Sequence, residues 1–136
     1  MAHETALEFL RRNHRIVLAT YRKDGQVQLS PVVASVDEQS RVVISTRQGA
    51  MKTRNVRRNP RASMCALGER FYGAWYSLEG AAEIIELPEA MDVLVEYYKQ
   101  VSGEHPDWQE YREAMVREGR VVLRITVDRS GPTKQG

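Results

Sequence analysis

The chain has 136 residues, 42% of them hydrophobic, and a formal net charge of +2 at pH 7. This length fits a single domain over residues 1–136, and the apolar content excludes wholesale disorder. No apolar run approaches the ~20 residues of a membrane helix, and the charged N-terminus is unlike a signal peptide. The one cysteine, Cys65, excludes an intrachain disulfide, so we expect a cytoplasmic protein without a membrane partner.

The first part of the chain predicts a helix followed by strands joined through short turns. Apolar residues at helical spacing indicate an amphipathic helix over Thr5–Asn13. Arg15–Tyr21 and Val27–Val36 are rich in β-forming residues, and the Asp-Gly pair between them is a strong hairpin signal. Pro31 lies inside the second strand and predicts a bulge, an edge or a break. A polar turn then leads to a strand over Arg41–Ser45.

The middle of the chain predicts a basic helix and two more strands. The helix stops before Pro60, because proline cannot continue it. Strands are expected over Ala62–Leu67 and Phe71–Glu86, with bends or bulges at Gly73 and Gly80.

The last third predicts two helices and a final strand. Pro88 suits the opening turn of the first helix, and Asp107 suits the N-cap of the second. The second helix has an apolar stripe of Trp108, Tyr111, Met115 and Val116. Arg120–Val127 reads as a strand, followed by a loose polar tail over residues 128–136. About six strands with inserted helices predict an α+β fold around a small, mainly antiparallel barrel.

Charge is distributed unevenly along the chain. From Arg41 to Arg61 there are seven Lys or Arg residues and no acidic ones, whereas Glu79–Glu118 has eleven acidic residues against three basic ones. Within the basic part, Val42–Pro60 reads as a strand, a small-residue turn and a short helix. A helix N-terminus presents free N–H groups and a positive dipole end, so this stretch predicts a phosphate site.

Four groups of residues are candidates for holding a phosphorylated cofactor with an aromatic ring. Hydroxyl, ammonium and amide donors for the phosphate are Ser45, Thr46, Lys52 and Asn55. Arginines for a longer anionic tail are Arg47, Arg57 and Arg58. Residues beside the edge of a ring are Gln28, Ser30 and Pro31, and aromatic walls are Tyr72, Trp75 and Tyr76. The alternatives are a solvated helix face for the phosphate donors, arginines that only keep the helix soluble, an ordinary hairpin strand for the ring edge, and core packing for the aromatic residues.

The residues give little support to catalysis by the protein alone. The three histidines are scattered without metal-ligand spacing, and Cys65 lies in a strand that reads as buried core. Most of the carboxylates fall on solvent positions of helices, and no glycine-rich dinucleotide or P-loop motif is present. We therefore expect no metal and a cofactor that performs the chemistry.

A family resemblance rests on the stretches LATYRKDGQVQLSPV, VVISTRQGAMKTRNVRRNPRAS, YSLEGAAEI, GEHPDW and YREAMVREGRVVLRI. Together they resemble the pyridoxamine 5′-phosphate oxidase-like superfamily of split β-barrel proteins. The likeness is greatest to its actinobacterial branch of deazaflavin-dependent oxidoreductases, which use coenzyme F420. It runs from about Phe9 to Val127, and the K-T-R-N-hydrophobic-R-R-[ND]-P-R-A-S pattern is its most specific part.

This resemblance implies an FMN-binding split barrel that forms an obligate homodimer with cofactor sites at the subunit interface. It places the phosphate-binding positions on Ser45, Lys52 and Asn55, and the deazaflavin edge on Gln28, Leu29, Ser30 and Pro31. Residues contributed across the dimer fall near Trp75 and Ser77. Some relatives carry an arginine where this chain has Ala50, which implies a weaker phosphate grip unless Arg47 substitutes.

The implied activity is hydride transfer between reduced F420 and an electron-poor small molecule, with Tyr72 as a possible proton donor. An FMN-dependent enzyme of the same fold is the alternative, since FMN also carries a phosphate. A non-catalytic cofactor carrier is a second alternative. Binding of nucleic acid through the basic helix is not expected, because one short basic helix in a near-neutral chain is weak evidence for it.

Overall fold

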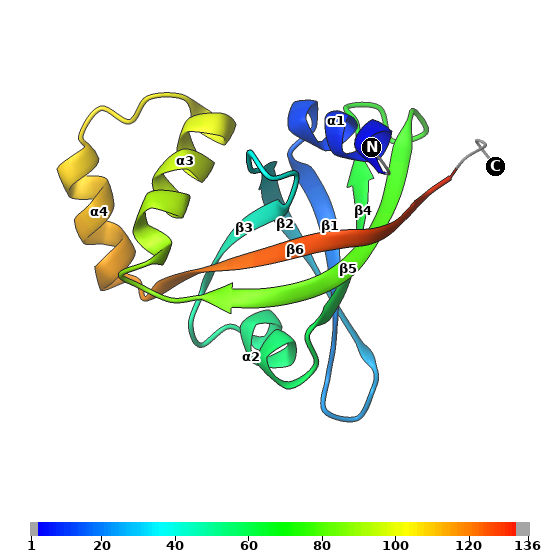
Figure 1. Cartoon of the computed structure of the whole chain (residues 1–136), viewed down its shortest axis with the longest axis horizontal. Helices are drawn as coiled ribbons and strands as arrows, with labels where there is room; N and C mark the ends of the chain where they lie inside the picture. The colour runs from blue at the N-terminus through cyan, green and yellow to red at the C-terminus, as the bar shows by residue number, and fades with distance from the viewer. Residues whose placement is uncertain (1–2, 133–136) are drawn as a thin grey trace.

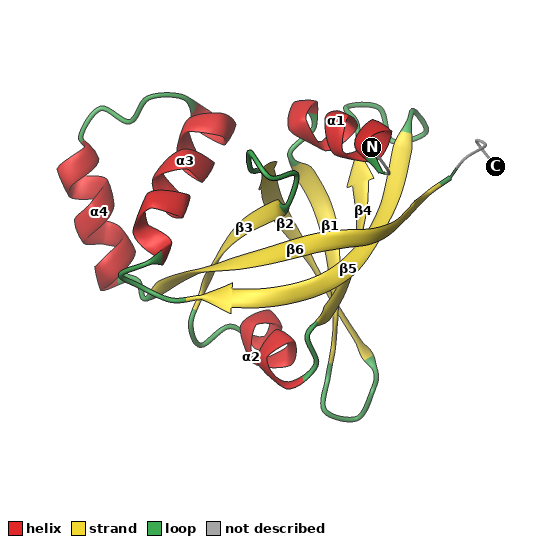
Figure 2. Cartoon of the chain, viewed as in Figure 1, coloured by secondary structure: helices red, strands yellow, loops and turns green. Residues whose placement is uncertain are grey.

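The computed structural model describes residues 3–132, whose six strands form a closed antiparallel barrel in the order β1-β2-β3-β6-β5-β4 (Figures 1 and 2). The strands are β1 (Arg15–Tyr21), β2 (Val27–Val36), β3 (Val42–Arg47), β4 (Arg61–Leu67), β5 (Trp75–Ile85) and β6 (Arg120–Gly131). The helices are α1 (Glu4–Arg12), α2 (Met51–Arg58), α3 (Ala90–Ser102) and α4 (Trp108–Arg117). The expected α+β barrel is confirmed.

Alternation along the strands fills the barrel. Residues such as Ile16, Leu18, Ile44 and Leu123 point inward and are almost fully buried. Helix α1 covers one end of the barrel and α2 the opposite end, and α3 and α4 lie to one side, next to β3 (Figure 1). A second apolar cluster, built around Leu94, joins α3 and α4 to the outer face of β3 and β6.

Strand β2 passes through Pro31 without a break. It pairs with β1 over Val27–Val33 but with β3 only over Ala34–Val36. The part that contains Pro31 therefore has one edge without a ladder partner, which is where a residue lacking an N–H is tolerated. Of the three options open for Pro31, the edge position is confirmed.

Strand β5 differs from its prediction at one end and agrees at its bend. Residues 71–74 form a turn rather than strand, closed by a hydrogen bond from Gly73 N–H to the Arg70 carbonyl (2.9 Å). The register between β5 and β6 shifts between Glu79 and Gly80, so the predicted bulge at Gly80 is confirmed. A Cβ at Gly80 would lie 1.9 Å from the Thr126 carbonyl oxygen, so only glycine fits.

The first part of the predicted tail, residues 128–131, is the end of strand β6. Its polar residues pair through their backbone with β5, and Asp128 forms an ion pair with Arg61. The prediction of a loose tail was therefore wrong for residues 128–131, and residues 133–136 lie outside the described part.

Smaller predictions about the helices and the cysteine had mixed outcomes. Asp107 caps α4 by accepting a hydrogen bond from Glu110 N–H (3.1 Å), as predicted. Pro88 precedes α3 in a turn instead of opening the helix, and Val116 is 63% exposed rather than buried. Cys65 is only half-buried, on the outer face of β4, and burial raises the pKa of its thiol. Among the described residues, none of the helices has the length and apolar character needed to cross a bilayer.

Candidate functional site

The N-terminus of α2 is open to a ligand. Its N-cap is Ala50, which provides no side-chain cap, and its first turn contains no acidic residue. The preceding turn is fixed by hydrogen bonds from the Thr53 hydroxyl to the Arg47 carbonyl (2.7 Å) and from Gln48 N–H to the Gly119 carbonyl (2.9 Å). Free backbone N–H groups at a helix N-terminus favour an anion.

A hollow of about 660 Å³ lies beside this turn. Residues 47–50 form one side of it, and residues 116–119, from the end of α4 and the following turn, form the other. The Arg47 side chain is 64% exposed, and its ion pair with Glu118 is long, at 3.9 Å. An exposed pair of this kind contributes little to stability, so Arg47 can turn towards a ligand at low cost.

The basic residues of α2 differ in what already occupies them. Arg58 donates through Nη2 to the Tyr21 carbonyl (2.7 Å) and to Asn55 Oδ1 (2.8 Å), and Arg57 pairs with Glu86 at 3.4 Å. Within residues 3–132, Lys52 and Arg54 have no ion-pair partner. These two cations are therefore the ones on α2 that are available to an anion.

Two of the predicted phosphate-binding side chains are buried beneath α2. Asn55 is 0% exposed and donates through Nδ2 to Thr20 Oγ1 (3.1 Å), which joins α2 to β1. The Thr46 hydroxyl lies 3.3 Å from that of Thr53. Ser45 points to the opposite face of β3 from Thr46, as neighbours on a strand do. The structure therefore does not bring Ser45, Thr46, Lys52 and Asn55 to one surface, and direct contact of all four with a phosphate stays a prediction.

Sequence reasoning missed the positioning roles of Thr20 and Thr53, which fix the helix from below. Thr20 is the inward-pointing residue near the end of β1, and Thr53 lies one turn into α2. Alternation with apolar residues along β1 indicates burial of Thr20, but nothing in the sequence identifies partners 35 residues apart, such as Thr20 and Asn55.

The predicted ring-edge residues line the open edge of β2. Leu29 and Pro31 face outward, and Gln28 and Ser30 lie on the other side of the strand. Their side chains therefore do not share a face, whereas the backbone of Val27–Val33 has an unpaired edge. Backbone N–H and C=O groups on such an edge can recognise the polar rim of a flat ring.

On the outer face of β2, β1, β4 and β5, the apolar side chains Val17, Leu29 and Val33 belong to neither apolar cluster of the described residues, and we call it the uncovered face. The strand registers place Pro31, Val17, Cys65 and Ser77 in one row across it. Large apolar side chains on it are exposed: Leu29 by 62%, Val27 by 45% and Val33 by 38%. An apolar area of this kind on a protein surface marks an interaction site.

The predicted aromatic wall is divided between core and surface. Tyr76 packs on Phe9 with ring centroids 5.1 Å apart, so for Tyr76 the alternative of core packing is the one observed. Trp75 lies on the uncovered face, and Tyr72 is 96% exposed in the turn before it, with its ring 5.0 Å from that of Phe71.

One chain does not bring the wall and the α2 stretch together. Trp75 pairs with Leu67 beyond the Arg15 end of β1, whereas α2 contacts the Tyr21 end through Arg58. The six residue steps of β1 separate these ends by roughly 20 Å. Within one chain these two groups therefore lie towards opposite ends of β1.

Comparison with known proteins identifies the fold with a known class. The barrel is that of the pyridoxamine 5′-phosphate oxidase-like split barrels, and residues 2–133 match the family model for pyridoxamine 5′-phosphate oxidase. The chain belongs to this family. Its membership supports an oxidoreductase-type protein with a flavin-type cofactor.

Solved structures with the same fold have different described functions. A conserved hypothetical protein from Mycobacterium tuberculosis is 28% identical, with a TM-score of 0.78 over 96% of this chain and 82% of that one. A protein described as an F420 reductase is 19% identical (TM-score 0.71, covering 91% and 94%). A pyridoxamine 5′-phosphate oxidase-related, FMN-binding protein from Nostoc punctiforme is 14% identical (TM-score 0.70, covering 96% and 82%). The last two likenesses show the fold alone.

Proposed function

We propose that this protein is a coenzyme F420-dependent oxidoreductase that acts on an electron-poor small molecule. The observation that carries the proposal is the uncapped N-terminus of α2, with the available cations Lys52 and Arg54 and the hollow beside it. F420 has both a phosphate and a polyglutamate tail, so a helix end with the available cations Lys52 and Arg54, and the exposed Arg47 beside it, suits it better than a cofactor with a phosphate alone.

The donors of this chain fit such a cofactor in kind. Backbone N–H groups of the first turn of α2 and the Lys52 ammonium would hold the phosphate, and Arg47 would occupy the role that Ala50 cannot fill. The open edge of β2 at Gln28–Pro31 would orient the ring. When bound, the deazaflavin supplies hydride transfer.

A homodimer formed through the uncovered face would complete the site. The partner copy would bring its Trp75 and Ser77 against the ring; within one chain, Trp75 lies about 20 Å from the end of β1 that contacts α2. These side chains would exclude water from the ring and orient the substrate. Tyr72, which is 96% exposed in one chain, would act as a proton donor only if the partner buries it beside the substrate.

Titration of the purified protein with F420 and with FMN, followed by fluorescence quenching, tests the cofactor. We expect F420 to bind at least tenfold more tightly. Tighter binding of FMN would overturn the proposal and favour an FMN-dependent enzyme, which the family name also suits. Tight binding of F420 without turnover of enones, quinones or tetrapyrroles would instead indicate a carrier.

Replacement of Lys52 by alanine tests the phosphate position. Losing a charge-assisted hydrogen bond should weaken F420 binding by about 1–3 kcal/mol, which is roughly a 5- to 150-fold rise in Kd. The matched control is Arg12→Ala on α1, a solvent-exposed cation at the other end of the barrel. An unchanged Kd for Lys52→Ala would show that the phosphate lies elsewhere.

A further inference from the structure

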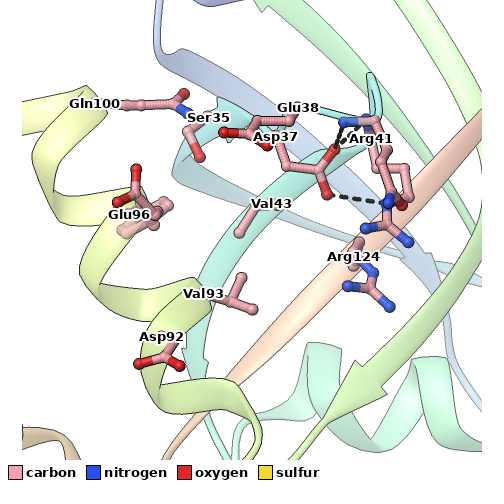
Figure 3. Close-up of a pocket in the computed structure, with 12 residues that line it drawn as sticks. Ser35, Asp37, Glu38, Arg41, Val43, Asp92, Val93, Glu96, Gln100 and Arg124 are labelled. Atoms are coloured by element: carbon pink, nitrogen blue, oxygen red, sulfur yellow. Dashed lines mark hydrogen bonds and ion pairs between the residues drawn. The ribbon is translucent and has the colours of Figure 1, made fainter.

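A second hollow, of about 370 Å³, lies away from α2. It is enclosed by the end of β2 and the turn after it, by β3 and β6, and by α3 on the opposite side (Figure 3). Val43 and Val93 form part of its wall, and charged side chains surround them. None of the residues in this hollow is needed for the proposed cofactor site.

Two arginines share one end of this hollow. Val43 pairs directly with Arg124 across β3 and β6, and Arg41 precedes Val43 by two residues. The two arginines are therefore diagonal neighbours on adjacent strands, about 7 Å apart. Figure 3 shows both guanidinium groups at the same end of the hollow. Arg41 therefore lies on this hollow and not beside α2, although its position in the sequence groups it with the basic residues around α2.

Each arginine is held through Nε, and its terminal nitrogen atoms remain available. Arg41 Nε donates to Asp37 Oδ2 (2.9 Å), and Arg124 Nε donates to Glu83 Oε2 (3.2 Å). Among residues 3–132, no protein group accepts a hydrogen bond from an Nη atom of either arginine. Their side chains are only 24% and 18% exposed, so both are fixed in place before any ligand arrives.

The opposite wall is acidic. Asp92 and Glu96 lie one turn apart on α3 and line the hollow on the side opposite β3 and β6, which carry the arginines (Figure 3). Their ion pairs, with Arg112 at 3.9 Å and with Lys99 at 3.8 Å, are long and exposed and hold them weakly. Glu38 adds a further carboxylate to the rim.

We propose that this hollow binds a small zwitterion, with its anionic group on Arg41 and Arg124 and its ammonium group on Asp92 and Glu96. Paired Nη groups recognise a carboxylate or a phosphate-like group with good geometry. Carboxylates outnumber guanidinium groups around the hollow, so an anion without a positive end meets net repulsion. A cation without an anionic group cannot bind the guanidinium groups of Arg41 and Arg124.

Isothermal titration of the full chain with four matched probes tests this site. The probes are 4-aminobutyrate, 3-aminopropylphosphonate, butyrate and butylamine. We expect at least one of the two zwitterions to bind tenfold more tightly than butyrate and butylamine, and the preferred zwitterion identifies a carboxylate or a phosphate-like group. Equal binding of all probes, no binding of either zwitterion, or tightest binding of butyrate or butylamine would overturn the proposal.

Substitutions on the two walls of the hollow test the anion-binding and the cation-binding parts separately. Arg124→Gln should weaken the zwitterion at least tenfold, and Glu96→Gln, at an exposed helix position, should reduce its advantage over butyrate without affecting the fold. Arg117→Gln on α4, outside the hollow, is the control and should leave binding unchanged. If Arg124→Gln does not fold, Glu96→Gln decides alone. Unchanged relative affinities in Glu96→Gln would overturn the proposal.

Discussion

The barrel has two faces that differ in what covers them. The outer face of β3 and β6 carries Val43 and Val122, both almost fully buried by α3 and α4. The uncovered face of β2, β1, β4 and β5 carries apolar residues of similar size, such as Leu29 and Val33, which remain exposed to solvent. The chain thus covers one face with its own helices and leaves apolar side chains of the other exposed.

This difference explains where the two kinds of charge are found. The acidic Glu79–Glu118 segment provides the helices that cover the first face, and their carboxylates lie mainly on the solvent side. The basic α2 closes an end of the barrel next to the uncovered face, with Arg58 joined to the end of β1. A covered face that repels anions and an open end that attracts them direct an anionic ligand to α2.

Gly80 is the residue at which β5 passes from one face to the other, and its replacement should have the largest effect. Residues before it pair with both β4 and β6, whereas those from Ala82 onward pair with β6 alone. The Cβ of Gly80→Ala would meet the Thr126 carbonyl at 1.9 Å, and no flexible side chain can move aside. We expect a loss of more than about 4 kcal/mol, or no folded protein, in urea unfolding followed by circular dichroism.

Gly49→Ala is the control for that substitution. A Cβ at Gly49 has no heavy atom within 4 Å, so its effect on unfolding should stay within about 0.5 kcal/mol. Equal effects of the two alanines would contradict the close approach of β5 and β6 at the bulge.

Replacing Leu94 is the most direct test of how α3 and α4 pack on the covered face. This side chain is 0% exposed between α3, α4 and the sheet, so Leu94→Ala should cost roughly 2–5 kcal/mol of unfolding free energy. Val116→Ala, on the exposed side of the same helical hairpin, should cost less than about 0.5 kcal/mol. A small effect at Leu94 would mean that the hairpin is not packed on the barrel.

Much of the fold could be predicted because it depends on local signals. The Asp-Gly turn and strand alternation located β1 and β2, proline located the end of α2, and Asp107 located the start of α4. The turn at 71–74 was missed because Phe71 and Tyr72 are strong β-formers that here lie exposed. The end of β6 was missed because its polar residues show no apolar alternation, and they are held by pairing with β5 and by the ion pair of Asp128 with Arg61, far along the chain.

The candidate site was less predictable, because its geometry depends on long-range contacts. Basic residues near α2 were visible as a cluster, but their partners Glu86 and Asp128 lie far along the chain. The burial of Asn55 depends on its hydrogen bond with Thr20 on β1. Arg41 lies away from the other basic residues because Asp37 binds it and closes the turn before β3. Sequence therefore indicated an anion site but not which donors face outward.

The uncovered face is tested by adding charge to it. Leu29→Glu would place a carboxylate in the middle of the proposed dimer interface, so the dissociation constant should rise about a hundredfold, equivalent to roughly 2.7 kcal/mol. Sedimentation velocity at micromolar concentration measures it, with Val116→Glu on α4 as the exposed control. A wild-type chain that sediments as a monomer would contradict the dimer itself, and an unchanged Leu29→Glu dimer would place the interface elsewhere.

The smallest expected effect concerns pH and the covered face. Tyr111 is 6% exposed and donates to the Leu94 carbonyl (2.8 Å), and burial raises the pKa of its phenol from 10 to about 12. A raised pKa means that the folded state favours the neutral phenol, so this stability is complete below pH 10 and is lost as pH rises towards 12. The loss of unfolding free energy, measured by urea unfolding, should reach about 2 kcal/mol near pH 12, because each tenfold difference in acidity between the folded and unfolded states corresponds to about 1.4 kcal/mol.

Tyr111→Phe is the control because it lacks the titrating group, and at neutral pH it should lose about 1 kcal/mol with the hydrogen bond. Its stability should then fall less steeply than that of the wild type above pH 10, and parallel curves would show that Tyr111 does not titrate against burial.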